Sequence, residues 1–278
     1  MQSNTLAVLF ALASALTIAW GTVVRHRIAE HAPEGKSPFL TAIRRPLWWA
    51  GMSTAIIAYM LQVVALAFGP LLVVQPVLVM SLMFTLPLSA IYDGRRVSLS
   101  ETFWSALLTA GVGVVVILGR PVGGEAHPEI QRWIPSLVVG SLILVGMERI
   151  ARRLIRRERA LLEGLVTGAL FGFVAVFSKA VADVFVSGGI PGLLTAWELY
   201  ALTATASIGT YVQQNAFNAG ALRTSLPAMK IGEPIVAFSL GYIVLGEKFQ
   251  VYDWEWVWMG LAILVVVVAT VVLSRKSL

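Results

Sequence analysis

The feature that most constrains this chain is a succession of apolar runs of about twenty residues that follow one another almost end to end. A helix rises 1.5 Å per residue, so each run is long enough to cross about 30 Å of hydrocarbon. Only 13% of the 278 residues are charged, whereas soluble domains carry about 25%. We therefore predict an all-α polytopic membrane protein, because an open strand would leave its backbone groups unsatisfied in lipid.

The apolar runs predict about nine transmembrane helices, and the basic residues predict their orientation. The expected spans are 4–24, 47–69, 70–92, 102–118, 134–156, 160–186, 192–218, 223–246 and 253–274. Sixteen of the 21 basic residues fall on one side of these spans, three fall on the other side and two lie inside spans. Because cytoplasmic loops collect Lys and Arg, we expect a multi-pass protein of the plasma (inner) membrane with its N-terminus outside and its C-terminus cytoplasmic.

Two short stretches of the chain repeat one another. QPVLVMSL (75–82) and EPIVAFSL (233–240) share a proline, a serine and a leucine at the same positions, and each lies in an expected span. The two spans are five crossings apart, so the copies run in opposite directions through the membrane. We therefore predict two inverted-topology repeats, an architecture common in secondary transporters. The expected halves are residues 1–118 and 134–278, joined by an extracytoplasmic linker at 119–133.

The proline in each copy predicts a hinge. Pro76 and Pro234 have no backbone N–H, so the carbonyls of Leu72 and Lys230 lose their intrahelical partners. In lipid, such a carbonyl is tolerated only where it is buried in protein or faces water or substrate. We expect both helices to be kinked at a functional site; a proline kink that serves packing alone is the alternative.

The second copy lies within MKIGEPIVAFSLGYIVLGEKF, which resembles the signature of the last motif helix in the drug/metabolite transporter (DMT) superfamily, including EamA-type carriers. The stretch FGPLLVVQPVLVMSLMFTLPLSA, with RRPLWW before it, is similar to NIPA-type members, which include proteins assigned to magnesium transport. The resemblance implies the DMT fold and secondary transport. The family pattern has two sets of five helices, whereas four spans precede 119–133 here. No residue is therefore carried over from the family's first helix.

Ionisable residues inside spans are costly in lipid and are candidate functional residues for that reason. Lys179 with Asp183, and Lys230 with Glu233, form two pairs at helical spacing, whereas Glu198 has no such neighbour. Each pair either fixes packing alone or opens during transport to take a proton or an ionised substrate. The residues expected to line the transport path are Lys230, Glu233, Lys179, Asp183, Glu198, Gln75, Tyr211 and Gln214.

Two further patterns narrow the function. The embedded lysines favour an anionic or zwitterionic solute, or a lipid head group, over magnesium, because hard cations prefer oxygen ligands. No cysteine is present and the three histidines lack metal-ligand spacing, so no metal site is expected. Gly164, Gly168 and Gly172 form a doubled G-x-x-x-G, which favours close helix packing within the chain, with dimerisation as the alternative.

Together these patterns predict a secondary active transporter of the DMT type that moves a small, charged solute by alternating access. The alternatives are a divalent-cation (magnesium) transporter of the NIPA type and a flippase for lipid head groups or lipid carriers. We expect no enzyme activity, no cofactor and no nucleic-acid partner; the coupling species would be a proton or a cation. Expected partners are a small-molecule or lipid substrate and membrane lipids, with the chain as monomer or homodimer.

Overall fold

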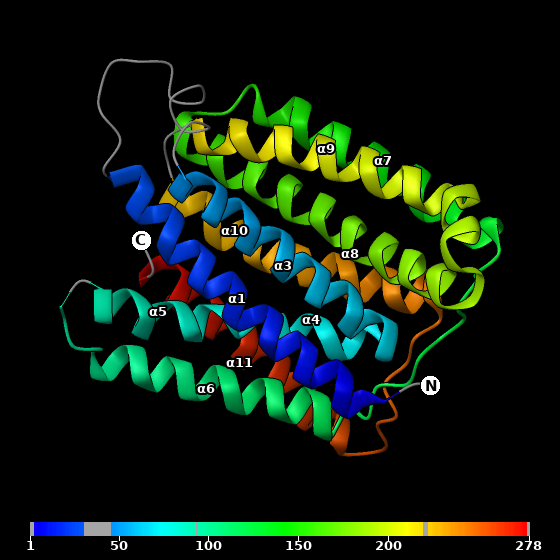
Figure 1. Cartoon of the computed structure of the whole chain (residues 1–278), viewed down its shortest axis with the longest axis horizontal. Helices are drawn as coiled ribbons and strands as arrows, with labels where there is room; N and C mark the ends of the chain where they lie inside the picture. The colour runs from blue at the N-terminus through cyan, green and yellow to red at the C-terminus, as the bar shows by residue number, and fades with distance from the viewer. Residues whose placement is uncertain (1–2, 31–45, 93, 219–221, 277–278) are drawn as a thin grey trace.

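The computed structural model describes residues 3–30, 46–92, 94–218 and 222–276, and these ranges form a bundle of long helices (Figure 1). Within them no β-strand occurs, which confirms the all-α prediction. The elements in chain order are α1 (Asn4–Glu30), α3 (Pro46–Phe68), α4 (Leu71–Val79), α5 (Ser81–Tyr92), α6 (Leu99–Ile117), α7 (Ile130–Ala151), α8 (Arg156–Thr195), α9 (Trp197–Asn218), α10 (Leu222–Leu240), the π-helical turn η1 (Gly241–Leu245) and α11 (Glu255–Lys276).

Seven helical segments of the described ranges are long and apolar enough to cross a membrane. They lie in α1, α4 with α5, α6, α7, α8, α10 with η1, and α11. The chain is thus an integral, multi-pass membrane protein. The other two predicted spans correspond to α3, whose apolar part is the shorter segment Ser53–Phe68, and to α9, which is rich in Thr, Ser, Gln and Asn. For these two helices the crossing stays a prediction.

Successive helices run in alternating directions between two ends of the bundle (Figure 1). We name these ends by a residue at each. The Ser3 end also holds the connections 69–70, 118–129 and 246–254, and the Lys276 end holds the start of α3, α6, α8 and α10. This up-and-down order brings segments that are distant in sequence together at the same end.

The two motif copies fold differently. The first copy is interrupted: α4 contains Pro76 and ends at Met80, and α5 begins at Ser81. The second copy continues through Pro234 to Leu240 and then tightens into η1, which Gly246 ends with a left-handed φ of 71°. The break in the first copy therefore follows the predicted hinge by one turn, whereas the second copy stays helical across its proline.

Several predicted boundaries shift. Helix α8 continues to Thr195 across a non-helical Gly189 (φ 58°, ψ −155°), and α9 begins only at Trp197. The predicted start of a span at residue 192 is wrong, because the chain after Gly189 re-enters a helix before it turns. Helix α7 begins at Ile130, inside the stretch 119–133 that the sequence predicted to be linker.

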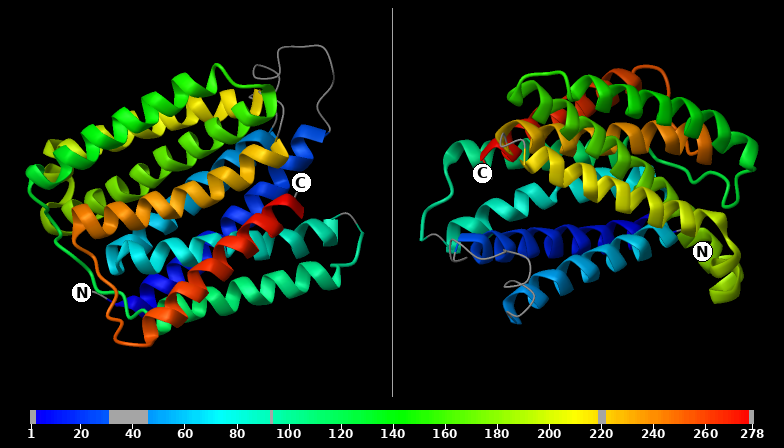
Figure 2. Two further views of the ribbon diagram at one scale, coloured as in Figure 1. Left: turned by 180° about the vertical axis from the view of Figure 1, so that it is seen from behind. Right: turned by 90° about the horizontal axis from the view of Figure 1, so that it is seen from above.

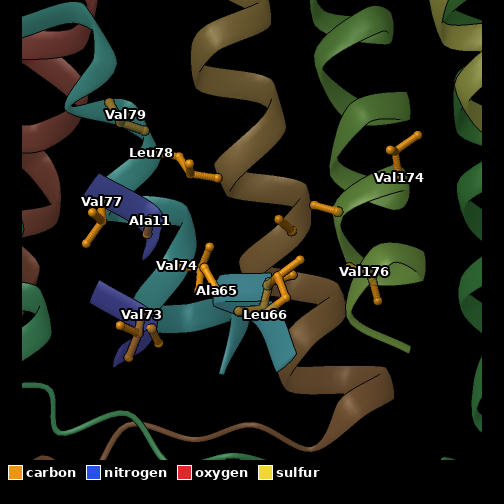
Figure 3. Packing of buried hydrophobic residues seen from close by; sticks show 14 of the residues in the cluster. Ala11, Ala65, Leu66, Val73, Val74, Val77, Leu78, Val79, Val174 and Val176 are labelled. Carbon is orange, nitrogen blue, oxygen red and sulfur yellow. The ribbon is translucent and has the colours of Figure 1, made fainter. Parts of the chain in front are cut away.

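The core forms where α4 enters the bundle. Every residue of α4 is buried, and α4 contacts α1, α3, α6, α8 and α10. Figure 3 shows Val73, Val74, Val77 and Leu78 of α4 near Leu66 of α3, with Val176 of α8 beyond them. A short helix surrounded on all sides can carry an uninterrupted apolar sequence, and LLVV and VLV on either side of Gln75 and Pro76 supply it.

The predicted glycine contact lies between α8 and α10, which are neighbours in both views of Figure 2. A Cβ atom at Gly168 would lie 2.5 Å from the carbonyl oxygen of Met229, and one at Gly172 would lie 2.7 Å from Cβ of Val236. Gly232 of α10 faces Gly168 in turn. The prediction that these glycines pack helices within the chain is confirmed.

Candidate functional site

A cavity of ≈ 540 Å³ lies among α3, α8, α9 and α10, about halfway along these helices. Helix α3 belongs to the first predicted half and the other three to the second. The volume suits a small molecule. Its polar and aromatic walls are formed by Tyr59 and Gln62 of α3, Phe171 of α8, Thr203, Ser207 and Thr210 of α9, and Glu233 of α10.

Glu233 lines this cavity without a partner. Among the described residues its carboxylate has no hydrogen bond and no ion pair within 4.0 Å, and Lys230, three residues earlier, acts on it only as a more distant charge. The backbone of Glu233 packs closely against α8. Its N and O atoms lie 3.0 and 2.9 Å from the points that a Cβ atom would occupy at Gly168 and at Gly172. The glycine contact therefore positions the carboxyl group at the cavity wall, and the predicted Lys230–Glu233 pair is not formed.

Helix α9 presents a stripe of hydroxyl groups to the cavity. Thr203, Ser207 and Thr210 recur at intervals of four and three residues, so they share one face of the helix. Each donates its hydrogen to the carbonyl four residues earlier, over 2.9 Å for Thr203, 2.8 Å for Ser207 and 2.8 Å for Thr210. Their oxygen atoms keep lone pairs that can accept hydrogen bonds from a ligand in the cavity.

Lys179 and Asp183 form a closed pair nearer the Ser3 end. The ammonium Nζ lies 2.8 Å from Oδ1 of Asp183 and also donates to the carbonyl oxygen of Leu66 over 2.9 Å. That carbonyl is available because the residue four positions later is Pro70, which has no N–H. Lys179 of α8 thus ties the end of α3 to the second half, and the pair does not line the cavity.

Glu247 is a functional candidate that lay outside the spans predicted from the sequence. Its side chain is fully buried, and its two carboxylate oxygens accept hydrogen bonds from the backbone N–H groups of Leu71 (2.7 Å) and Leu72 (2.9 Å). These are the first free N–H groups of α4, since Pro70 precedes them. Burial raises the pKa of Glu247 to about 7, although both N–H groups and the Lys179 ammonium favour the charged form.

Backbone contacts join the two halves around Glu247. Val122 and Lys248 exchange hydrogen bonds of 2.9 and 3.2 Å, and the N–H of Gln250 donates to Gly119 over 2.9 Å. Glu125 donates its N–H to the carbonyl of Leu245 over 2.8 Å. The connection 118–129 is therefore bound to the segment 245–250, which closes the Ser3 end.

At the Lys276 end the described ion pairs join residues that are close in the chain, including Arg95 with Glu101 over 3.1 Å. Glu163 is fully buried and bonds Arg159 over 2.7 Å, and Glu148 bonds Arg152 over 3.3 Å. An exposed hydrogen bond of 2.8 Å between Lys276 and Ser100 links the halves there. The sequence missed Glu163 because it stands in the first turns of a predicted span, beside Arg-rich loop sequence.

Comparison with known proteins finds a relative of nearly the same length. Over 281 aligned residues the chain is 63% identical to the uncharacterized protein Cgl0250/cg0304 of Corynebacterium glutamicum, and the alignment covers 100% of this chain and 97% of that one. The chain belongs to that protein's family. No family model and no solved structure matches the chain.

The remaining predicted site residues of this family member lie around the cavity rather than in it. Gln75 is buried in α4, and its amide nitrogen has no hydrogen-bond partner among the described residues. Glu198 is buried in the first turn of α9, one turn before Leu202 of the cavity wall. Gln214 continues the hydroxyl face of α9 by one turn, whereas Tyr211 is 68% exposed and lies off that face.

Other signals in the sequence could have located the site more fully. The hydroxyl residues of α9 recur with a helical period that is visible in the sequence, and they line the same cavity as Glu233. Glu247 lay within the quoted LGEK exit of the second motif, but it follows the predicted span 223–246. The described residues contain no group of three or more His, Cys, Asp and Glu side chains placed to hold a metal ion.

Proposed function

We propose that this protein is a secondary active transporter that moves a small, charged solute by alternating access, with the cavity among α3, α8, α9 and α10 as its substrate site. The observation that carries the proposal is the unpaired carboxylate of Glu233 at the wall of a cavity between helices of both halves. An ionisable group within a membrane bundle is costly, and one without a partner adds nothing to packing. Such a group is retained where it meets a ligand.

The pattern of helix contacts supports two inverted repeats of the DMT type. Helix α1 packs against α3, α4 and α5, and α8 packs against α9 and α10 in the same way. Helices α6 and α11, which close the two halves, pack against each other. The corresponding helices run in opposite directions, as an inverted repeat requires. Within the described ranges α7 has no counterpart in the first half, which agrees with the missing first helix of the resemblance.

In this proposal the structure represents a state closed at the Ser3 end. To open there, Glu247 must release the N–H groups of α4 and Lys179 must release the carbonyl of Leu66. The pKa of Glu247 is raised to about 7 in this closed state, so the closed state binds a proton more tightly than a state that exposes the carboxyl group to water, and a proton would favour this closure near neutral pH. Placing the Ser3 end outside the plasma membrane follows from the distribution of basic residues and is part of the proposal.

Accessibility of the cavity from the two sides of the membrane tests alternating access. The chain has no cysteine, so a single Ser207→Cys variant reports on the cavity directly. In membrane vesicles of either orientation, we expect a membrane-impermeant maleimide to label this variant from both sides. Val97→Cys and Ala126→Cys, in exposed loops at opposite ends, are the controls and should each react from one side. Labelling of the cavity variant from one side under every condition would contradict alternating access.

One observation favours the lipid-carrier alternative. An apolar groove of ≈ 550 Å³ lies between α7, α8 and α10, on the other side of α10 from Glu233. Its walls include Val139, Phe173, Ile235 and Ile243, and acyl chains fit such a surface. A scrambling assay with fluorescent phospholipids in reconstituted vesicles distinguishes the two functions, because a solute transporter leaves lipid asymmetry unchanged.

A further inference from the structure

The polar atoms of the cavity wall offer lone pairs but few hydrogens. A Ser or Thr hydroxyl has one hydrogen and two acceptor lone pairs. The hydrogens of Thr203, Ser207 and Thr210 are directed at backbone carbonyls of α9, at 2.8 to 2.9 Å. Their oxygens can therefore only accept from a ligand in the cavity.

The hydroxyl group of Tyr59, which lines the cavity from α3, is also engaged in a hydrogen bond. Ser178 donates its single hydrogen to the carbonyl of Val174 over 2.7 Å. In the 2.8 Å contact between Ser178 and Tyr59, the donor must then be the tyrosine hydroxyl. The phenol oxygen likewise presents only lone pairs. Among the described residues that line the cavity, Gln62 is the one side chain with N–H groups.

The charge at the wall has the sign that suits these acceptors. Glu233 is the charged residue among those that line the cavity. Lys230 does not line it and makes no ion pair with Glu233 within 4.0 Å, although the Lys230 charge acts on that carboxyl group from a longer distance. Lys179 is occupied by Asp183 and by the carbonyl of Leu66. An anion in this cavity would face a carboxylate and a row of lone pairs, so the site disfavours it.

We propose that the cavity binds a small organic cation whose ammonium group carries N–H donors. Glu233 is its counter-ion, the hydroxyl oxygens of α9 and Tyr59 accept its hydrogen bonds, and the rings of Tyr59 and Phe171 contact its apolar part. This inference rests on the transporter function proposed above and names its substrate class. It replaces the expectation, drawn from the two embedded lysines, of an anionic or zwitterionic solute.

The charge preference is measurable without knowledge of the natural substrate. The Ser207→Cys variant, purified in detergent as the full chain, is treated with methanethiosulfonate reagents that carry a trimethylammonium, a primary ammonium or a sulfonate group. Rates at Ala126→Cys, in an exposed loop, correct for the intrinsic reactivity of each reagent. Relative to this control, we expect the trimethylammonium reagent to react about tenfold faster than the sulfonate reagent, because charged clefts change local concentrations by about that factor or more.

Substitution at Glu233 tests the source of the preference. In Ser207→Cys combined with Glu233→Gln, the ratio should fall toward that of the control, whereas Glu233→Asp should retain it. The primary ammonium reagent should exceed the trimethylammonium reagent by a few fold at the cavity site, because only the former donates N–H bonds. Elution as a single monodisperse peak shows that each variant is folded, and Glu233→Asp keeps the test valid if the amide variant aggregates.

Three results would overturn the inference: a preference for the sulfonate reagent, equal corrected rates for both charges, or no reaction with any reagent. Each is obtained in detergent, where no transport takes place. Failure of the transport proposal is read separately, from labelling of vesicles on one side alone. A cavity that prefers cations but is reached from one side would retain the substrate class and reject alternating access.

Discussion

The two ends of the bundle are held together by different kinds of contact. At the Ser3 end, buried groups of the second half bond the first half. Glu247 accepts hydrogen bonds from the start of α4, and Lys179 donates one to the end of α3. At the Lys276 end the buried Glu163 is bonded within its own helix, and an exposed hydrogen bond joins Lys276 to Ser100 of the other half. Separating the halves at the Lys276 end therefore costs less free energy, because water can replace the exposed hydrogen bond that is broken there.

The largest effect is expected at Lys179. Lys179→Met leaves the carboxylate of Asp183 and the carbonyl of Leu66 without their partner in a mostly buried site. Breaking a buried pair from one side costs about 3–5 kcal/mol, so we expect a loss of that size in the free energy of unfolding. Thermal and denaturant unfolding in detergent measure it. Lys179→Met combined with Asp183→Asn should recover part of the loss, and an unchanged double variant would show that the pair is not coupled.

The next effect is expected at Glu247. Glu247→Ala removes the acceptor from two buried N–H groups of α4, and each unsatisfied group costs about 1–3 kcal/mol, so we expect a loss of about 2–6 kcal/mol. The matched control is Glu125→Ala in the same end of the bundle, where the ion pair with Arg132 is about half exposed and should not measurably stabilise. Equal melting temperatures for the two variants would place the closure elsewhere.

The pKa of Glu247 gives the Ser3 end a pH dependence. Its value of about 7 lies above the ordinary 4.5, so the folded chain binds more protons than the unfolded chain between these pH values. Stability should fall as pH rises from 4.5 to 7, by no more than about 3 kcal/mol from this group, and should then level off. Glu247→Gln should flatten this part of the stability profile. A slope that survives the substitution would assign it to other groups.

The smallest effect is expected at the Lys276 end. Lys276→Ala removes an exposed hydrogen bond to Ser100, and exposed substitutions usually change stability by less than about 0.5 kcal/mol. The melting temperature should match that of the unmodified protein. A loss comparable to that of Glu247→Ala would remove the difference between the two ends.

The sequence predicts this fold well where apolar runs are long, because a helix in lipid has few alternatives. It predicts the ends of helices less well: Gly189 and Pro191 lie between the predicted spans 160–186 and 192–218, yet α8 continues past a non-helical Gly189 to Thr195. The break at Met80 lies one turn beyond the hinge predicted at Pro76, and no local signal gives this position, because no residue there is a strong helix breaker.

For the site, the sequence predicts which residues are unusual but not which of them meet. Lys179 and Asp183 pair, as their spacing of four allows, whereas Lys230 and Glu233 do not. That outcome depends on Gly168 and Gly172, which fix α10 so that the Glu233 carboxyl lies at the cavity. Glu247 and Leu71 are 176 residues apart, and no local pattern predicts a cap over that separation.

The contact between Gly168 and Gly232 also limits how the binding wall can move. At this point two backbones touch with no side chain between them, so sliding one past the other would drive Cα and carbonyl atoms into each other. Helices α8 and α10 are therefore expected to move as one rigid unit that includes Phe171 and Glu233. In the proposed transport cycle, a solute would therefore leave through movement of α3 or α9 relative to α8 and α10, and its counter-ion Glu233 would keep its place for the next solute.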